Sequence, residues 1–129
     1  MGYPMAGHLA AAGHDVRVFN RTAAVAERWC VDHAGTAAAT PADAARDAEL
    51  VFVCVGADDD VRAVLYGDSG ALDALESGAV VVDHTTASAT LAIELADACA
   101  QRGVGFVDGP ISGGQAGAEN GVLSVMCGG

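Results

Sequence analysis

Residues 1–22 read MGYPMAGHLAAAGHDVRVFNRT, and their order of elements indicates the fold. Gly2 stands just before a helical run over Pro4–Ala12, which has a proline near its start and Gly13 after its end, the usual helix start and stop signals. The β-branched run Val16–Phe19 then predicts a strand. Glycine, helix, glycine and strand in this order are typical of the second half of a dinucleotide-binding unit. Gly2 would be the third glycine of G-x-G-x-x-G, the one that allows close packing of helix on strand.

Strand-like and helix-like segments alternate along the rest of the chain. The runs Leu50–Val55 and Val80–Asp83 are almost continuously apolar, which is typical of parallel strands covered on both faces. Further strands are expected over Thr36–Ala38, Val104–Asp108 and Leu123–Cys127, and helices over Ala23–His33, Ala42–Arg46, Asp59–Leu65 and Ser88–Arg102. This alternation predicts an α/β fold with a Rossmann-like doubly wound parallel sheet.

The predicted sheet lacks its first strand. A doubly wound sheet normally opens on a strand that becomes central, whereas a helix comes first here. We therefore expect residues 1–129 to form an incomplete NAD(P)-binding domain, without the first strand and the first two glycines of the motif. In the usual strand order 3-2-1-4-5-6, that strand lies between Val16–Phe19 and Leu50–Val55. We expect a gap or a strained pairing between these two strands.

Composition excludes several classes of protein. The formal net charge is −11, and the six basic residues are scattered arginines with no lysine among them, so binding to nucleic acid through its phosphates is not expected. No run of about 18 apolar residues and no signal-peptide pattern occurs, so we expect a cytoplasmic protein with no membrane span. The four cysteines form no C-x-x-C pair, and we expect no metal site.

The residues after the predicted strand Val16–Phe19 bear on the choice of cofactor. An Asp or Glu at this point usually binds the ribose 2′-hydroxyl of NAD, but here the chain reads Asn20, Arg21, Thr22. A carboxylate would repel a 2′-phosphate, whereas the Arg21 guanidinium can pair with it and stack on adenine. These residues predict NADP as the preferred cofactor, with NAD also possible.

A glycine-rich segment over Asp108–Leu123 indicates a second site. Pro110 stiffens the exit from a strand, and Ser112, Gly113 and Gly114 then offer a hydroxyl and unobstructed backbone N–H groups. The segment follows the carboxyl end of a predicted strand, where open α/β sheets bind ligands. It therefore predicts a loop that binds the carboxylate of a small substrate.

Together, four motifs resemble the β-hydroxyacid dehydrogenase family, which includes 3-hydroxyisobutyrate dehydrogenase and tartronate semialdehyde reductase. The resemblance covers the whole chain in the right order and spacing. The motifs are Met1-Gly2-Tyr3-Pro4-Met5-Ala6, Asn20-Arg21-Thr22, Asp83-His84-Thr85-Thr86, and Asp108-Gly109-Pro110-Ile111-Ser112-Gly113-Gly114 with Gly117-Ala118 and Gly121.

The resemblance implies a role for individual residues. Asn20, Arg21 and Thr22 would hold the adenosine end of the cofactor, and Ser112, Gly113 and Gly114 the substrate carboxylate. Val55 and Gly56 match a Leu-Pro pair that lines the cofactor, although Gly56 departs from the proline, and Thr86 matches a threonine near the nicotinamide ribose. His84 stands where serine is more frequent, and a catalytic role for it is not favoured.

The resemblance also implies parts that residues 1–129 do not contain. The family's general acid/base is a lysine on a helix beyond the nucleotide-binding domain, and this chain has no lysine. The lysine is therefore expected beyond Gly129, as is an all-helical C-terminal domain that carries most of the dimer contacts and makes the whole enzyme a homo-oligomer. Residues 1–129 alone are expected to be inactive.

The expected reaction of the whole enzyme is hydride transfer between NADP(H) or NAD(H) and a small 3-hydroxyacid, such as 3-hydroxyisobutyrate or a tartronate semialdehyde-type acid. Imine reductases and 6-phosphogluconate dehydrogenases share the fold and a similar Ser-Gly-Gly loop, and they remain alternatives. A phosphosugar would favour basic residues near that loop, and none lies between Gly103 and Gly129. A non-catalytic dinucleotide-binding module is the third alternative.

Overall fold

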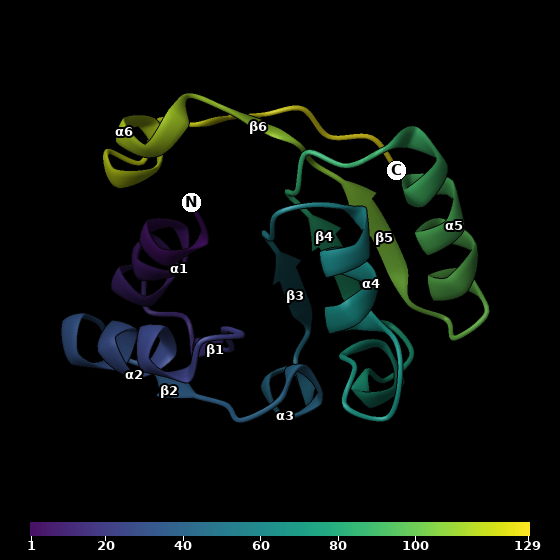
Figure 1. The fold of residues 1–129 in the computed structure, drawn as a ribbon, viewed down its shortest axis with the longest axis horizontal. Helices are drawn as coiled ribbons and strands as arrows, with labels where there is room; N and C mark the ends of the chain where they lie inside the picture. Colours follow the sequence, from purple (N-terminus) through teal and green to yellow (C-terminus); the bar gives the residue numbers. More distant parts are fainter.

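A computed structural model describes residues 1–129, in which helices and short strands alternate (Figure 1). In chain order the elements are α1 (Gly2–Ala11), β1 (Arg17–Val18), α2 (Ala23–Asp32), β2 (Thr36–Ala37), α3 (Pro41–Ala45), β3 (Leu50–Val53), α4 (Asp58–Leu65), the 3-10 helix η1 (Leu72–Ala74), β4 (Val80–Asp83), α5 (Ala89–Ala100), β5 (Gly105–Asp108), β6 (Ile111–Ser112), α6 (Gly114–Glu119) and β7 (Ser124–Val125).

The strands form three separate sheets. Strands β3, β4 and β5 pair in parallel in the order β3-β4-β5, β1 pairs in parallel with β2 alone, and β6 pairs with β7 in antiparallel fashion. Parallel strands with helical crossovers confirm the predicted α/β fold, which matches a Rossmann-like domain.

The main core lies on one face of the three-stranded sheet, under α4 and α5 (Figure 1). Helix α5 presents Leu91, Leu95 and Cys99 at i, i+4 and i+8, and all three are fully buried, as the predicted apolar stripe requires. Ser88 caps this helix, since its hydroxyl accepts a hydrogen bond of 3.1 Å from the Leu91 N–H. The opposite face is less covered, because Leu50 and Phe52 of β3 remain 53% and 45% exposed.

A smaller packing unit joins α1 to α2. Trp29 is 2% exposed, and its indole N–H donates to the Tyr3 carbonyl over 3.1 Å. The His33 ring lies 5.2 Å from the Trp29 ring, centroid to centroid, and it also lies so close to Gly7 that a Cβ there would come within 2.5 Å of it. Gly7 therefore permits the close contact of the two helices.

The predicted gap is confirmed, because β1 and β3 do not pair with each other. In doubly wound order the strands run β2-β1, then an empty position, then β3-β4-β5. Helix α3 spans the two halves near the amino ends of the strands (Figure 1). The Arg17 guanidinium of β1 donates to the Asp43 carbonyl over 3.1 Å, and the Ala42 N–H donates to the Ser69 carbonyl over 2.9 Å.

Several sequence-based expectations were wrong in detail. Strand β3 comprises Leu50–Val53 of the expected Leu50–Val55, and β7 comprises Ser124–Val125 of the expected Leu123–Cys127. The glycine-rich segment after Asp108 is not a loop throughout, because it contains strand β6 and helix α6. Strand β1 comprises only Arg17–Val18 of the expected Val16–Phe19, since only these two residues pair with β2, its one partner.

No helix in the structure has both the length and the apolar character needed to cross a lipid bilayer.

We predict that the 129-residue chain self-associates through the facing edges of β1 and β3, because unpaired backbone groups on apolar strands are a template for further pairing. Each such group costs about 1–3 kcal/mol when buried without a partner, against a total stability of about 5–15 kcal/mol. Fusing about ten residues of the form strand-G-x-G upstream of Met1 should give a monomer and raise Tm by about 5–10 °C. Sedimentation velocity and thermal melts measure both effects.

The control is an upstream segment of equal length with alternating prolines, which cannot donate ladder hydrogen bonds and should give no rescue. A chain of 129 residues that is monomeric and melts cooperatively without any added strand would contradict this prediction.

Candidate functional site

The loops that follow β3, β4 and β5 begin at one edge of the sheet. The register pairs Val53 with Asp83, and Asp83 with Asp108, so the three strands end at the same level. Ligands of open α/β sheets bind outside the carboxyl ends of the strands. The predicted residues Val55, Gly56 and Thr86 lie in two of these loops.

The β3 and β4 loops are fastened to each other by hydrogen bonds. The Val55 N–H donates to the Thr85 hydroxyl oxygen over 3.1 Å, and the Thr85 N–H donates to the Asp83 carboxylate over 2.9 Å. Burial raises the pKa of Asp83, which is 2% exposed, while these bonds from Thr85 oppose that rise. The bond from Val55 to Thr85 holds Val55 at the β4 loop. Thr86, the residue after Thr85, is exposed to solvent.

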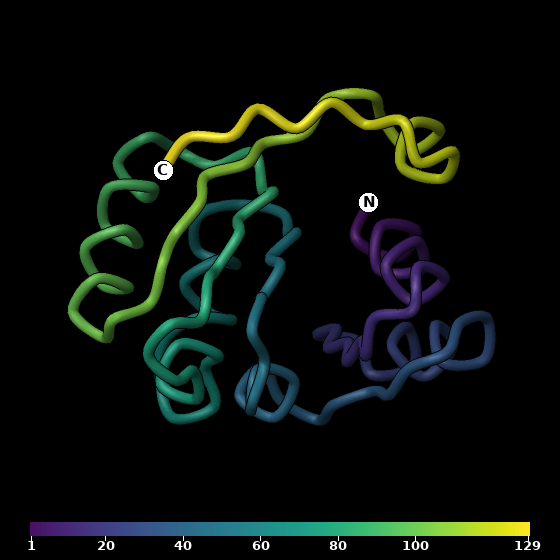
Figure 2. Tube along the Cα trace, turned by 180° about the vertical axis from the view of Figure 1, so that it is seen from behind, coloured from purple at the N-terminus to yellow at the C-terminus, as the bar shows by residue number.

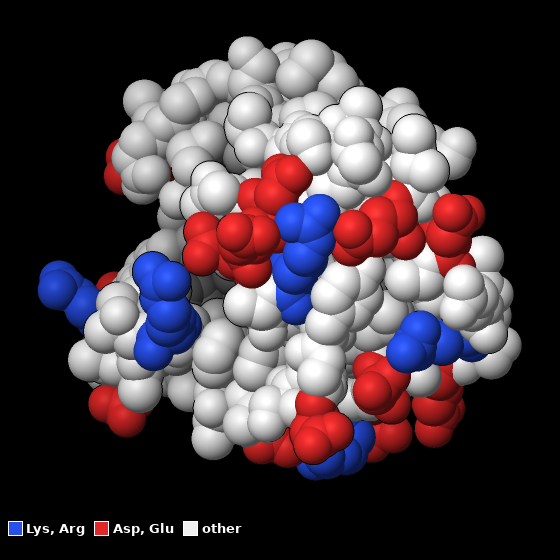
Figure 3. All heavy atoms as spheres, turned by 45° about the vertical axis from the view of Figure 1, so that its right-hand side comes forward, with Lys and Arg blue, Asp and Glu red and all other residues white.

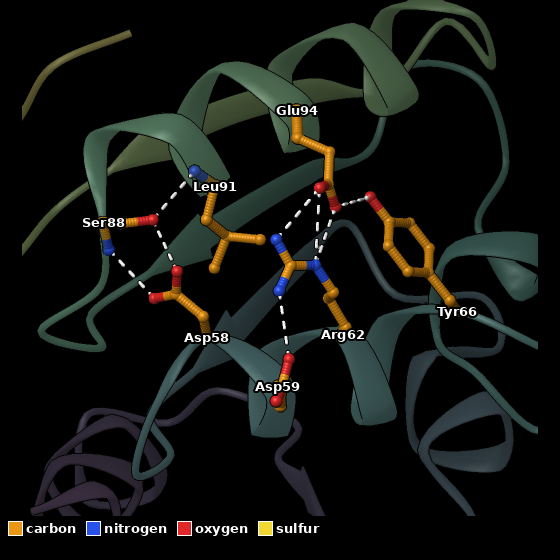
Figure 4. Close-up of polar contacts among 7 residues, drawn as sticks. All are labelled: Asp58, Asp59, Arg62, Tyr66, Ser88, Leu91 and Glu94. Carbon is orange, nitrogen blue, oxygen red and sulfur yellow. Dashed lines mark hydrogen bonds and ion pairs between the residues drawn. The ribbon is translucent and has the colours of Figure 1, made fainter.

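A polar network ties the starts of α4 and α5 together on the outside of these loops (Figure 4). The Ser88 N–H and hydroxyl both donate to the Asp58 carboxylate, and the N–H bond measures 2.9 Å. These bonds from Ser88 lower the pKa of Asp58 below its ordinary value. Asp58 therefore fixes the distance between the loop that carries Gly56 and the loop that carries Thr86.

One turn further along α4, Arg62 donates to the Glu94 carboxylate of α5 over 3.1 Å and to Asp59 over 3.1 Å (Figure 4). Hydrogen bonds from Arg62, and then from Tyr66, lower the pKa of Glu94. Burial, followed by the bond to Glu94, raises the pKa of Tyr66 to about 12, so its hydroxyl stays protonated and donates to the Glu94 carboxylate over 2.8 Å.

The surface on this side of the molecule is mainly acidic. Acidic side chains, with a few arginines among them, form a band across it (Figure 3).

The predicted adenosine-end residues lie in the loop between β1 and α2. The Asn20 side-chain oxygen accepts a hydrogen bond of 2.9 Å from the Thr22 N–H, which shapes the turn before α2. The Arg21 side chain is 90% exposed, and its guanidinium lies 3.5 Å from the Asp60 carboxylate of α4. Asp60 also neighbours Gly56, where a Cβ would come within 2.9 Å of its Oδ2 atom.

Gly2 begins α1 beside the carboxyl end of β3. A Cβ on Gly2 would lie 3.5 Å from the Cys54 Cβ, an ordinary contact distance. Helix α1 and β3 are in contact here, but a small side chain would also fit at this position. Burial raises the pKa of the Cys54 thiol, which disfavours the thiolate form.

Ser112, Gly113 and Gly114 lie on a separate arm, made of β6, α6 and β7, that reaches from β5 across to α1 (Figures 1 and 2). Gly113 and Gly114 have φ angles of 135° and 65°, a left-handed region that residues with side chains rarely adopt. The His8 ring of α1 holds the arm by donating from Nε2 to the Ala118 carbonyl over 2.9 Å. All three predicted residues are exposed.

His84 is part of the framework in this structure. It is 7% exposed, its ring stacks on Phe52 at 5.7 Å between centroids, and its Nδ1 lies 2.6 Å from the Gly109 carbonyl oxygen. Because a carbonyl only accepts, Nδ1 must carry the proton. The bond fastens the end of β4 to the residue after β5.

The structure thus brings Gly2, Val55, Gly56 and Arg21 near the ends of β1 and β3, whereas Ser112–Gly114 lie on the arm. A cavity of about 420 Å³ lies elsewhere, between α1, α2 and α6, and contains none of the predicted residues; it is lined by Tyr3, Pro4, Gly7, His8, Ala11, His33, Gln115 and Glu119.

Asp58 and Asp60 were not among the residues predicted from the sequence, although the run Asp58-Asp59-Asp60 follows shortly after Val55 and Gly56. Thr85 belongs to the motif Asp83-His84-Thr85-Thr86, but no role was predicted for it.

Residues 1–129 match the family described as the NAD binding domain of 6-phosphogluconate dehydrogenase. An uncharacterized oxidoreductase of Shewanella frigidimarina is 54% identical over the whole chain, which covers 44% of that protein. A probable 3-hydroxyisobutyrate dehydrogenase-like protein of Arabidopsis thaliana is 44% identical over the whole chain, which covers 39% of it. The chain therefore spans about two-fifths of the length of these curated relatives.

Solved structures are similar over the same region. Mycobacterium tuberculosis 3-hydroxyisobutyrate dehydrogenase with L-serine superposes with a TM-score of 0.90 at 31% identity, over 100% of this chain and 43% of that one. Psf3 in complex with NADP+ and 2-OPP superposes with a TM-score of 0.90 at 32% identity, over 98% of this chain and 45% of that one.

We predict that Asp58 makes the chain more stable at neutral than at acidic pH. Its pKa is lower in the folded state than the ordinary value of 3.8, so its stabilising effect is present above that value and is lost as the pH falls through the folded pKa. In chemical unfolding between about pH 5 and pH 3, Asp58→Asn should therefore show a shallower loss of the free energy of unfolding than the unmodified chain.

The matched control is Asp68→Asn, which removes an exposed aspartate outside the network and should leave the slope unchanged. Equal slopes for the Asp58→Asn variant and the unmodified chain would show that the bonds from Ser88 do not stabilise the carboxylate.

Proposed function

Because this chain belongs to the family of the NAD binding domain of 6-phosphogluconate dehydrogenase, we propose that it forms the cofactor-binding part of an NADP-preferring 3-hydroxyacid dehydrogenase. The observation that carries the proposal is the arrangement at the carboxyl edge of the sheet. The β3 and β4 loops are bonded to each other there, and the exposed Arg21 guanidinium reaches the start of α4. This is the edge at which open α/β sheets bind dinucleotides.

The side chains at this edge fit a nicotinamide dinucleotide. The Arg21 guanidinium is 90% exposed and open to a phosphate group, and no carboxylate follows β1 directly. Asn20 and Thr22 would contact the adenosine, Val55 and Gly56 would line the cofactor, and Thr86 would contact the nicotinamide ribose. Gly2 would bring the start of α1 to the pyrophosphate, where helix N–H groups favour anions. The nicotinamide would supply or accept the hydride.

The substrate would be a small acid whose carboxylate binds to Ser112, Gly113 and Gly114. The left-handed φ angles of the two glycines support this, because they turn the backbone of the arm where no side chain blocks it. Names of relatives support the class of substrate, since the similar proteins include 3-hydroxyisobutyrate dehydrogenases. Imine reduction or 6-phosphogluconate oxidation would be the alternatives on the same framework.

The acid/base group would come from a part of the whole protein outside residues 1–129, because the six basic residues of this chain are all arginines. His84 is a poor substitute, since it is buried and its Nδ1–H is committed to the Gly109 carbonyl. We propose that a lysine supplies the proton, and that the complete enzyme is a homo-oligomer.

We predict that Arg21→Ala weakens the binding of NADP+ by about 1–3 kcal/mol, the range for a lost charge-assisted hydrogen bond. The lower end is expected, because Arg21 is 90% exposed and solvent screens its charge. Binding of NAD+ should change less, since it lacks the 2′-phosphate. Calorimetric titration with each cofactor measures the two losses, and Arg28→Ala, an exposed arginine on α2, is the matched control. Equal losses for NADP+ and NAD+ would refute the assigned role.

We also predict that residues 1–129 alone, with NADP+ and any 3-hydroxyacid, produce no NADPH above a buffer control. The absorbance of NADPH measures this, and bound cofactor in the same sample shows that the chain is folded. Turnover that disappears in a His84→Gln variant would instead assign the acid/base role to His84.

A further inference from the structure

Three consecutive aspartates begin α4, and each has a different partner. Asp58 accepts hydrogen bonds from Ser88, and Asp59 pairs with Arg62 within the helix. Asp60 pairs with Arg21, which belongs to the other half of the chain. Of the three carboxylates, only Asp60 contacts a residue assigned to the cofactor.

The pair of Arg21 and Asp60 is loose. Its nitrogen–oxygen distance is 3.5 Å, longer than the distance of about 2.7–2.9 Å in a strong charge-assisted hydrogen bond. The Arg21 side chain is 90% exposed, so no packing holds the guanidinium in place, whereas the Asp60 side chain is 39% exposed. An approaching phosphate can therefore draw the Arg21 guanidinium away from Asp60. The Asp60 carboxylate then remains nearby, because it belongs to α4.

Asp60 lies between two proposed cofactor-binding residues. On one side it contacts Arg21, and on the other its Oδ2 atom lies within 2.9 Å of the point where a Gly56 Cβ would stand. A carboxylate in this position neutralises part of the Arg21 charge and repels a doubly charged 2′-phosphate. Acidic residues in dinucleotide-binding domains favour NAD by accepting a hydrogen bond from the ribose 2′-hydroxyl, and here such an acceptor is carried by α4 and not by the end of β1.

We propose that Asp60 is a specificity-determining residue that moderates the preference of Arg21 for NADP and keeps NAD acceptable. The inference rests on the proposed function, because it assigns a selectivity to the same site. In this view, the loop after β1 carries a cation, Arg21, for the 2′-phosphate of NADP. Helix α4 carries an anion, Asp60, for the ribose 2′-hydroxyl of NAD.

The test compares Asp60→Asn with Asp59→Asn. Both variants remove one negative charge from the start of α4, but only the first frees Arg21, because Asp59 pairs with Arg62. Dissociation constants for NADP+ and NAD+ are measured by calorimetry at low salt, on the chain with the strand-G-x-G segment fused upstream of Met1. Asp60→Asn should raise the ratio of NADP+ to NAD+ affinity about three- to fivefold, the size of an interaction between exposed charges, and Asp59→Asn should leave it unchanged. Salt of about 0.5 M should shrink the change.

Two further measurements isolate the 2′-phosphate and Arg21. Adenosine 2′,5′-bisphosphate should gain affinity for Asp60→Asn, and 5′-AMP should not, because the two differ only in the 2′-phosphate. In an Arg21→Ala background, Asp60→Asn should have a smaller effect, since the two side chains act on the same group. If Asp60→Asn does not fold, as judged by circular dichroism, Asp60→Ser takes its place.

The two proposals fail in different ways. If the chain with the strand-G-x-G segment fused upstream of Met1 binds neither dinucleotide, the proposed function is overturned, and the role of Asp60 with it. If that chain binds NADP+ and the affinity ratios of its Asp60 and Asp59 variants are equal, the proposed function stands and the role of Asp60 is overturned.

Discussion

The parallel register of β3, β4 and β5 is the constraint on which the candidate site depends. Since the strands point the same way and end level at Val53, Asp83 and Asp108, their loops leave from one edge of the sheet. Helices α4 and α5 then start at that edge, and their first residues can bond to each other, as Asp58 and Ser88 do. Without this register, the bond between Val55 and Thr85 could not form.

The two halves of the chain are joined without a continuous sheet. Near the amino ends of the strands, α3 links β1 to η1, and at the other end the arm that carries α6 reaches α1 (Figure 2). The loop after β1 adds the exposed pair of Arg21 and Asp60. These contacts are few and partly exposed, so each contributes little compared with a ladder of backbone hydrogen bonds. The carboxyl edge of the sheet is thus assembled from two bodies, and its cofactor-binding residues depend on how they are held together.

Neighbouring carboxylates in this protein differ in behaviour because their partners differ. Asp58 is stabilised as an anion by two donors from Ser88, whereas Asp83, at the end of β4, is buried and its pKa is raised. Asp60 faces an arginine that no packing holds in place. The carboxylate of Asp58 therefore joins two helices, that of Asp83 is a buried part of the framework, and that of Asp60 is a candidate determinant of cofactor selectivity.

Much of this arrangement could be predicted from the sequence, because it depends on local patterns. The apolar runs predicted β3 and β4, the i, i+4, i+8 stripe predicted the buried face of α5, and the opening helix predicted the gap between β1 and β3. The predicted roles of Asn20, Arg21 and Thr22, and of Ser112–Gly114, stay predictions.

Spacing along the chain was enough to predict the order of helices and strands, their apolar faces and the position of the missing pairing. Three contacts depend on the tertiary structure: Ile111 of the glycine-rich segment pairs with Val125, His84 bonds to Gly109, and Arg21 meets Asp60. These contacts join residues between 14 and 39 positions apart. Their energies depend on how separate elements pack, and no local pattern records that packing.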